Sequence, residues 1–203
     1  MNVLAFSPHT DDAEISAGGY LHRLATEGHA VRVVVLSPCV ASIPEGFERD
    51  VTTLECRQAL KTLGVRDVTI LDYAVRHFTR HRQAILDMMV QEKKDFRPDL
   101  VLSPSANDWH QDHAQVAVEA QRAFHDIQRL MWESPRQTHA TRHLCYARID
   151  VNDLRAKLSA CECYVSQRAR NPKPAVIDSL ARLRGYQAGS GLAEAYEVSK
   201  WTI

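Results

Sequence analysis

Short apolar runs alternate with longer amphipathic segments along most of this chain, and this alternation restricts the fold more than any other feature. Val3–Ser7 and Val31–Leu36 have the composition of buried strands. The segment between them, Glu14–Glu27, carries apolar residues at helical spacing and is followed by Gly28. Strands that alternate with helices predict βαβ units and a parallel sheet. We therefore expect an α/β fold.

The same rhythm continues toward the C-terminus. With right-handed crossovers, it predicts a single-domain Rossmann-like open sheet, mostly parallel, with strand order about 3-2-1-4-5 and helices on both faces. The further strands are expected at Val68–Leu71, at Asp99–Ser103, within His143–Ile149 and, as an edge strand, at Ala195–Trp201. The further helices are expected at Asp50–Leu63, Ala84–Phe96, His113–Leu130, Asp153–Gln167 and Ala175–Gln187.

Length and charge restrict the class of protein further. A chain of 203 residues fits one domain spanning residues 1–203. Acidic and basic residues balance at 25 each, which argues against a nucleic-acid partner. No apolar run approaches the roughly 18 residues of a membrane helix, so we expect no membrane insertion. The five cysteines are odd in number and form no CxxC pair, which fits a reducing compartment. With no signal-peptide pattern after Met1, we expect a cytoplasmic protein.

Two polar clusters follow predicted strands. Residues 7–14 follow the first strand, and residues 107–113 follow the fourth. Strands one and four are neighbours at the switch point of the predicted sheet, where open α/β sheets bind ligands beyond the carboxyl ends of their strands. The sequence therefore predicts that two segments about a hundred residues apart meet at one crevice.

These clusters contain the side chains that hydrolytic metal sites use. His110 and His113 are three residues apart at the start of a helix, so both imidazoles face the same side. His9 and Asp12 leave a strand end and approach from the other side. His9, Asp12 and His113 make a set of two histidines and one carboxylate with an open coordination position, which suits Zn²⁺ and would also accept Fe²⁺ or another divalent metal.

Neighbouring residues supply the remaining catalytic groups. A bound metal lowers the pKa of a coordinated water to roughly 7, and Asp11 is placed to take the proton. His110, one helical step from a ligand, is expected to donate to the oxyanion or to the leaving amine. Asp112 or Asp108 would hold the tautomer of His110.

Two motifs carry a family resemblance. Residues 8–14, PHTDDAE, resemble the P/A-H-P-D-D motif of the LmbE-like / PIG-L zinc-dependent N-deacetylases, and residues 110–113, HQDH, resemble that family's H-x-D-H motif. Weaker matches extend over essentially the whole chain. The resemblance implies an enzyme that removes an acyl group, usually acetyl, from an amino sugar such as an N-acetylglucosaminyl conjugate, and it suggests a homo-oligomer. By position it implies these roles: His9, Asp12 and His113 as zinc ligands, Asp11 as general base, His110 as electrostatic stabiliser or acid, and Asp112 as its tuning partner.

The chain departs from the family pattern at a few positions. Thr10 and Gln111 replace prolines, which removes no ligand. Thr52 stands where members that bind an anionic aglycone are expected to carry arginine. The candidates to replace that arginine are Arg49, Arg57 and Arg76.

Several other interpretations stay open from sequence alone. Asp11 and Asp12 could cap the following helix, Trp109 could line the pocket or pack, and residues 41–48 are a candidate lid. Two further functions are also compatible with the pattern: a metal-dependent hydrolase of another amide or ester, and a non-hydrolytic cofactor-binding Rossmann-like protein. The latter is weakened because the sequence contains no GxGxxG or P-loop motif.

Overall fold

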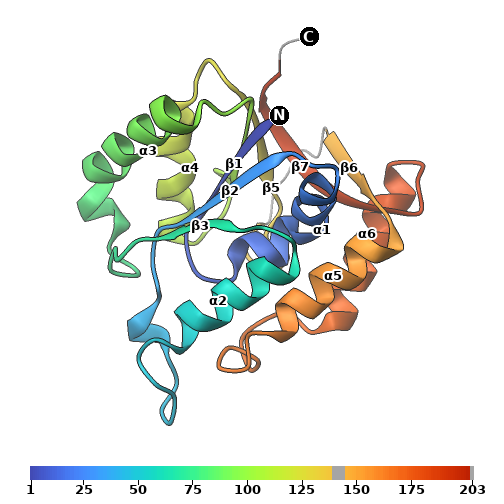
Figure 1. Cartoon of the computed structure of the whole chain (residues 1–203), viewed down its shortest axis with the longest axis horizontal. Helices are drawn as coiled ribbons and strands as arrows, with labels where there is room; N and C mark the ends of the chain where they lie inside the picture. Colours follow the sequence, from blue (N-terminus) through green and yellow to red (C-terminus); the bar gives the residue numbers. More distant parts are fainter. Residues whose placement is uncertain (139–144, 202–203) are drawn as a thin grey trace.

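The computed structural model describes residues 1–138 and 145–201. These residues form a seven-stranded sheet with strand order β3-β2-β1-β4-β5-β7-β6 (Figure 1). The strands are β1 (Asn2–Ser7), β2 (Ala30–Val35), β3 (Asp67–Ile70), β4 (Leu100–Pro104), β5 (Gln128–Trp132), β6 (Cys145–Ile149) and β7 (Leu192–Lys200). The helices are α1 (Asp12–Thr26), α2 (Val51–Thr62), α3 (Arg82–Phe96), α4 (Gln111–Ala123), α5 (Val151–Glu162) and α6 (Pro174–Gln187), with short 3-10 turns η1 (Val40–Ser42) and η2 (Phe78–His81).

The predicted fold class is confirmed. Strands β1 to β5 run parallel to their neighbours, in the order 3-2-1-4-5. The sheet continues beyond β5 with β7, which is antiparallel to β5, and with β6, which is antiparallel to β7. The result is the mostly parallel open sheet that the alternation predicts, extended by two strands.

The predicted position of the fifth strand was wrong. Helix α4 ends at Ala123 rather than at Leu130, and Gln128–Trp132 forms β5 beside β4. No glycine or proline separates the helix from the strand, so apolar spacing alone could not reveal the break. Cys145–Ile149, the described part of the range His143–Ile149, forms β6, and residues 143 and 144 lie outside the described residues.

The C-terminal strand was also misplaced. We expected an edge strand at Ala195–Trp201, but β7 begins at Leu192 and lies between β5 and β6. Tyr196 is in register with Trp132 on one side and with Cys145 on the other. The edge position was expected because the apolar segment is short, but the strand has nine residues, and its Glu194 and Glu197 are both buried.

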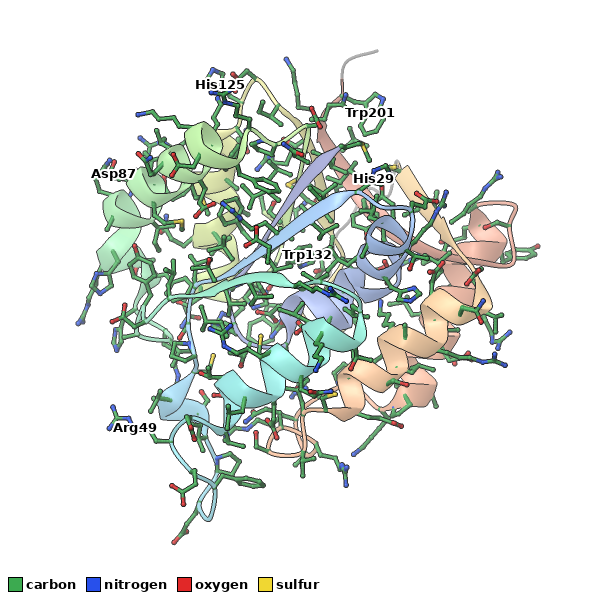
Figure 2. The ribbon with its side chains drawn as sticks, in the orientation of Figure 1. His29, Arg49, Asp87, His125, Trp132 and Trp201 are labelled. Carbon is green, nitrogen blue, oxygen red and sulfur yellow. The ribbon has the colours of Figure 1, made fainter. Side chains whose placement is uncertain are left out.

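Helices cover both faces of the sheet because its inner strands are apolar on both faces. Val3 and Ala5 pack with residues of α1, α2 and α5, whereas Leu4 and Phe6 pack with residues of α3 and α4 on the opposite face (Figure 1). Trp132 of β5 lies fully buried in the interior (Figure 2). Alternate residues of the central strands therefore supply two separate cores, as expected for a parallel sheet.

Helix α1, which follows the first polar cluster, is held by close contacts at its centre. Gly19 lies so near β6 that an added Cβ would stand 2.8 Å from Ile149 Cδ1. The Glu194 carboxylate accepts hydrogen bonds from the backbone N–H groups of Gly19 and Tyr20, each at 2.9 Å, and forms an ion pair of 2.5 Å with Lys157. These contacts join α1 to α5 and β7, so the helix that begins at the site is fixed by the C-terminal third of the chain.

Among the described residues, we find no helix with the length and apolarity required to span a bilayer.

Candidate metal centre

The two polar clusters meet at the carboxyl ends of β1 and β4, which pair directly with each other. The first cluster forms the connection from β1 to α1, and the second leads from β4 into α4. His9 Nδ1 lies 3.2 Å from His113 Nε2. The expectation that these segments share one crevice is therefore met.

Three side-chain atoms from the two clusters converge on one point. Asp12 Oδ2 lies 3.1 Å from His9 Nδ1 and 3.0 Å from His113 Nε2. Ligand atoms about 2.0–2.1 Å from a tetrahedral zinc ion stand roughly 3.3 Å apart. The spacing of the three atoms fits a divalent ion of that kind, and the donor set of two imidazoles and one carboxylate fits it chemically.

Each histidine of this group has a carboxylate on its other ring nitrogen. His9 Nε2 lies 3.1 Å from Asp112 Oδ2, and His113 Nδ1 lies 2.8 Å from Asp108 Oδ2. A ring nitrogen that donates its N–H to a carboxylate leaves the opposite nitrogen with a lone pair for a metal. The two carboxylates thus select the tautomers that direct His9 Nδ1 and His113 Nε2 toward the same point.

The expected role of Asp112 toward His110 is corrected by these contacts. The Asp112 carboxylate bonds to His9 and accepts backbone N–H groups from Arg76 at 2.6 Å and from Phe78 at 3.4 Å. The His110 ring instead receives the backbone N–H of Asp112, which donates to Nδ1 at 3.2 Å. The side chain of Asp112 therefore orients His9, and its backbone orients His110.

The charges of the converging group are strongly interdependent. Burial works to raise the pKa of Asp12, but His113 and His9 outweigh it and hold that pKa well below the usual range. Burial likewise opposes protonation of His113, yet Asp12 and Asp108 raise its pKa to about 10. Without a cation, protons on the histidines balance the carboxylates; a divalent ion would take over that role and displace them.

His110 offers an alternative third ligand. The candidate ligand atoms of His9, His110 and His113 lie within 4.8 Å of one another. However, His110 Nδ1 already accepts the Asp112 N–H, which places the proton of a neutral ring on Nε2. Burial, together with His113 and His9, lowers the pKa of His110 to about 4, so the ring is neutral near pH 7. This arrangement makes His110 a hydrogen-bond donor into the site and favours Asp12 as the third ligand.

Asp11 stands beside the group with its carboxylate uncommitted to the helix. It occupies the position before α1, but its side chain makes no capping hydrogen bond; instead Ser7 Oγ accepts the N–H of Ala13 at 3.1 Å. Burial, followed by the neighbouring Asp12, raises the pKa of Asp11 to about 6. Asn171 lies beside this carboxyl and lowers its pKa, although the geometry of its buried Nδ2 falls short of a hydrogen bond.

The group opens into a pocket of about 230 Å³. Its floor includes His9, Asp11, Asp12 and His110. Sequence reasoning missed most of the mouth, because loops carry no periodicity that would place their side chains. Most of the missed lining residues come from two segments, Ser134–Gln137 after β5 and, after α5, Gln167, Arg170, Asn171 and Pro172; Cys39 and Val75 also line the pocket.

Of the other residues singled out in the sequence, some lie outside the pocket lining and some within it. Trp109 is 61% exposed beside the site. Arg57 lines a separate surface cavity with His22 and Lys61, and Arg49 lies on the loop between β2 and α2 at the outer edge of the molecule (Figure 2). Of the three candidate arginines, Arg76 alone is a lining residue of the pocket. Ser42 of the candidate lid also lines it, and whether that loop closes stays a prediction.

Comparison with protein families identifies the chain's relatives. The model of the PIG-L family, described as GlcNAc-PI de-N-acetylase, matches residues 4–124. The chain belongs to this family. The resemblance read from the two motifs is thereby confirmed, and the matched PIG-L region contains all six residues of the predicted site.

Solved structures with the same fold cover nearly all of this PIG-L family member. The 4-carboxy-2-hydroxymuconate hydratase of Pseudomonas putida is 21% identical, with a TM-score of 0.84 over 100% of this chain and 98% of that one. The zinc-inhibited form of the teicoplanin deacetylase Orf2 is 20% identical, with a TM-score of 0.79 over 100% of both chains. The N,N'-diacetylchitobiose deacetylase of Pyrococcus horikoshii is 18% identical, with a TM-score of 0.78 over 97% of this chain and 82% of that one.

Proposed function

We propose that this protein is a divalent-metal-dependent N-deacetylase that removes an acyl group, in the simplest case acetyl, from the nitrogen of a small amino sugar or an N-acetylglucosaminyl conjugate. The observation that carries the proposal is the convergence of His9 Nδ1, Asp12 Oδ2 and His113 Nε2 to within 3.2 Å of one another. Membership of the GlcNAc-PI de-N-acetylase family supports the reaction.

His9, Asp12 and His113 would hold the ion, which we take to be Zn²⁺, with Fe²⁺ as an alternative for the same donors. An ion there would polarise the acyl carbonyl and lower the pKa of a coordinated water to roughly 7. Asp112 and Asp108 keep the two imidazoles in ligating tautomers. The open side of the group faces the pocket, where a substrate amide can enter.

We assign Asp11 as the general base for the attacking water. Its carboxylate lies in the pocket and is not engaged by the helix, so it is available to accept a proton from the attacking water. As the water oxygen bonds to the acyl carbon, the carbonyl oxygen gains negative charge. When the C–N bond breaks, the proton held by Asp11 passes to the leaving amine, so the reaction ends with a free carboxylic acid and a free amine.

His110 stabilises the negative charge that develops on the carbonyl oxygen. Its Nδ1 is occupied by the Asp112 N–H, which leaves Nε2–H to donate into the pocket. A neutral donor fixed before the reaction begins is the type of group that oxyanion holes use. We therefore assign His110 to electrostatic stabilisation rather than to proton transfer.

The direct test is acetate release by protein that has been stripped of metal and then reloaded. Zn²⁺ or Fe²⁺ should be added in steps below one equivalent, because one structural relative was obtained in a zinc-inhibited form. The substrates are N-acetylglucosamine and N,N'-diacetylchitobiose. We expect activity to rise linearly with metal up to one equivalent. Activity that is unchanged by metal removal would contradict the proposal.

Hydration of a carbon–carbon double bond is the second candidate. It is favoured by the likeness to the 4-carboxy-2-hydroxymuconate hydratase, which has a TM-score of 0.84. Adding water to a double bond also needs a base for the water and a donor for the growing negative charge, the roles that we assign to Asp11 and His110. Incubation with 4-carboxy-2-hydroxymuconate separates the candidates, since hydration removes the conjugated absorbance and deacetylation releases acetate. Hydrolysis of another amide or of an ester would appear in neither assay.

A further inference from the structure

Three arginine side chains line the pocket, and they come from distant parts of the chain. Arg76 follows β3, Arg136 follows β5, and Arg170 lies between α5 and α6. All three are exposed to solvent while lining the pocket, so they surround its mouth. The convergence of three guanidinium groups on one pocket is not predicted by the overall balance of charge, which is zero.

Within the described part of the chain, these arginines are held by neutral oxygens. Arg170 Nη1 donates to the Ser42 carbonyl at 2.8 Å, and Arg136 Nη1 donates to the Arg170 carbonyl at 3.2 Å. Arg76 Nη2 lies 3.4 Å from both the Ala41 carbonyl and Ser42 Oγ. Such contacts orient the side chains without neutralising them.

Several arginines elsewhere in the described chain are paired with acids. Arg32 contacts both Asp67 and Glu92, and Arg184 forms an ion pair with Glu133. At the pocket mouth, by contrast, the described contacts of Arg76, Arg136 and Arg170 are with neutral oxygens, so their positive charge is not compensated by a neighbouring carboxylate.

The acidic groups of the pocket do not cancel this charge. The acids among its lining residues are Asp11 and Asp12, both on the floor. Asp12 lies 3.1 Å from His9 Nδ1 and 3.0 Å from His113 Nε2, so its carboxylate is engaged by these two side chains. A ligand entering the mouth therefore meets three positive charges before it reaches the floor.

The backbone of Arg76 is hydrogen-bonded to Asp112, beside the candidate metal ligands. Its N–H donates to Asp112 Oδ2, the oxygen that also contacts His9 Nε2. Arg76 adopts φ 71°, in the left-handed region that non-glycine residues rarely occupy. The same residue thus orients a candidate ligand with its backbone and lines the mouth with its side chain.

We propose that Arg76, Arg136 and Arg170 bind an anionic group of the substrate, a carboxylate or a phosphate, while the reacting bond lies at His9, Asp12 and His113. Guanidinium groups match the planar or tetrahedral oxygens of these anions with paired hydrogen bonds. The proposal rests on the proposed function only in placing the reacting centre at that group. It adds that the natural substrate carries negative charge.

The first experiment compares neutral and anionic substrates that share one acetamido group. The zinc-loaded protein is assayed with N-acetylglucosamine, N-acetylglucosamine 6-phosphate and N-acetylmuramic acid, which carries a carboxylate. At low salt, kcat/KM should be at least about tenfold higher for one of the anionic substrates, and the advantage should shrink as NaCl is raised because the arginines are exposed. Equal values for all three substrates at low salt would overturn the proposal.

Variants assign the effect to the three side chains. Arg76→Met, Arg136→Met and Arg170→Met should each lower the ratio of kcat/KM for the preferred anionic substrate to kcat/KM for N-acetylglucosamine by roughly tenfold. Arg→Lys variants should recover part of the loss, because lysine keeps the charge without the paired geometry. Arg155→Met, at an exposed position on α5 outside the pocket, is the matched control and should behave as the parent protein.

A binding measurement separates this proposal from the proposed reaction. Calorimetric titration of the zinc-loaded protein with tricarballylate, and separately with inorganic phosphate, reports anion binding without turnover. Binding that is lost in the Arg→Met variants supports the arginine site even if no acetate is ever released. Binding that is equal in the parent and in all three variants would place the anion on the metal alone and would refute the arginine site, while leaving deacetylation intact.

Discussion

His9 Nδ1 and His113 Nε2 lie 3.2 Å apart although 104 residues separate them in the chain. Each ring is turned toward the other by a carboxylate on its far nitrogen, Asp112 for His9 and Asp108 for His113. The pair is therefore organised by groups that would not themselves touch a metal, so metal affinity should depend on residues behind the ligands as well as on the ligands.

Replacing Asp112 should weaken metal binding without removing a ligand. In Asp112→Asn the carboxylate that accepts from His9 Nε2 becomes an amide, so the His9 tautomer and basicity are no longer fixed. Loss of such a partner typically costs about 10–100-fold in metal affinity. Competition with a chromophoric chelator measures the change. Asp72→Asn, at an exposed position, is the control, and an unchanged affinity in Asp112→Asn would refute the orienting role of this side chain.

Paired histidine variants distinguish the two possible ligand sets. His113→Gln should lose bound metal, whereas His110→Gln should retain about one equivalent and lose roughly 10²–10³ in kcat through the missing oxyanion donor. Metal content by elemental analysis and acetate release are measured on the same samples. Should His110→Gln also emerge free of metal, His110 is a ligand. His125→Gln, in the exposed connection between α4 and β5 (Figure 2), is the control.

Asp11→Asn should keep its metal and lose turnover by roughly 10²–10⁴, the usual contribution of a general base. A base acts only when ionised, so kcat/KM of the parent enzyme should rise with pH through the pKa of Asp11. That pKa is about 6 in the metal-free protein, and a bound cation would move it lower. The variant should lack this acidic limb. Full activity in Asp11→Asn would assign the proton transfer to another group.

Glu14 should make stability depend on pH. Its carboxyl is 1% exposed, accepts a 2.6 Å hydrogen bond from the Tyr164 hydroxyl, and has its pKa raised by burial to about 8. Because this value exceeds that of the unfolded chain, the folded state holds the extra proton at intermediate pH. The stability associated with the neutral carboxyl is complete below about pH 4.5 and declines as pH rises toward about 8.

The test compares Glu14→Gln with the parent by urea unfolding at pH 5, 6, 7 and 8 under saturating metal. The stability of the parent relative to the variant should fall with pH by at most about 1.4 kcal/mol per unit. Glu162→Gln, at an exposed site, should show no such trend. A constant difference between parent and Glu14→Gln across the range would show that Glu14 stays ionised when buried.

The sequence predicted the first half of the fold better than the second. Strands β1, β2 and β4 are continuous apolar runs followed by turns, so their type and order could be read directly. β5 begins with Gln128 and the buried Arg129 and was absorbed into the preceding helical pattern. β7 carries Glu194 and Glu197, whose partners include Lys157 and Ser105 far away in the chain. Such long-range compensation of buried charge leaves no local signal.

The same distinction applies to the site. The six predicted site residues lie in two compact clusters that follow β1 and β4 in the chain. The pairing of these two strands brings the clusters together: His9, Asp11 and Asp12 from one, and His110, Asp112 and His113 from the other. The Asp112 carboxylate was predicted to contact His110 but contacts His9. Spacing along a helix does not reveal which of two nearby imidazoles a short side chain reaches. Arg136 and Arg170 could not be predicted, since both lie on loops, which carry no periodicity that would place their side chains.

The residues of the pocket come from two stretches of the chain. The six predicted site residues and Arg76 lie within residues 4–124, the region matched by the family model, whereas Arg136 follows β5, and Arg170 and Asn171 lie between α5 and α6. Exchange of the C-terminal third between relatives could therefore redirect which molecules are accepted while the bond-breaking apparatus is inherited unchanged.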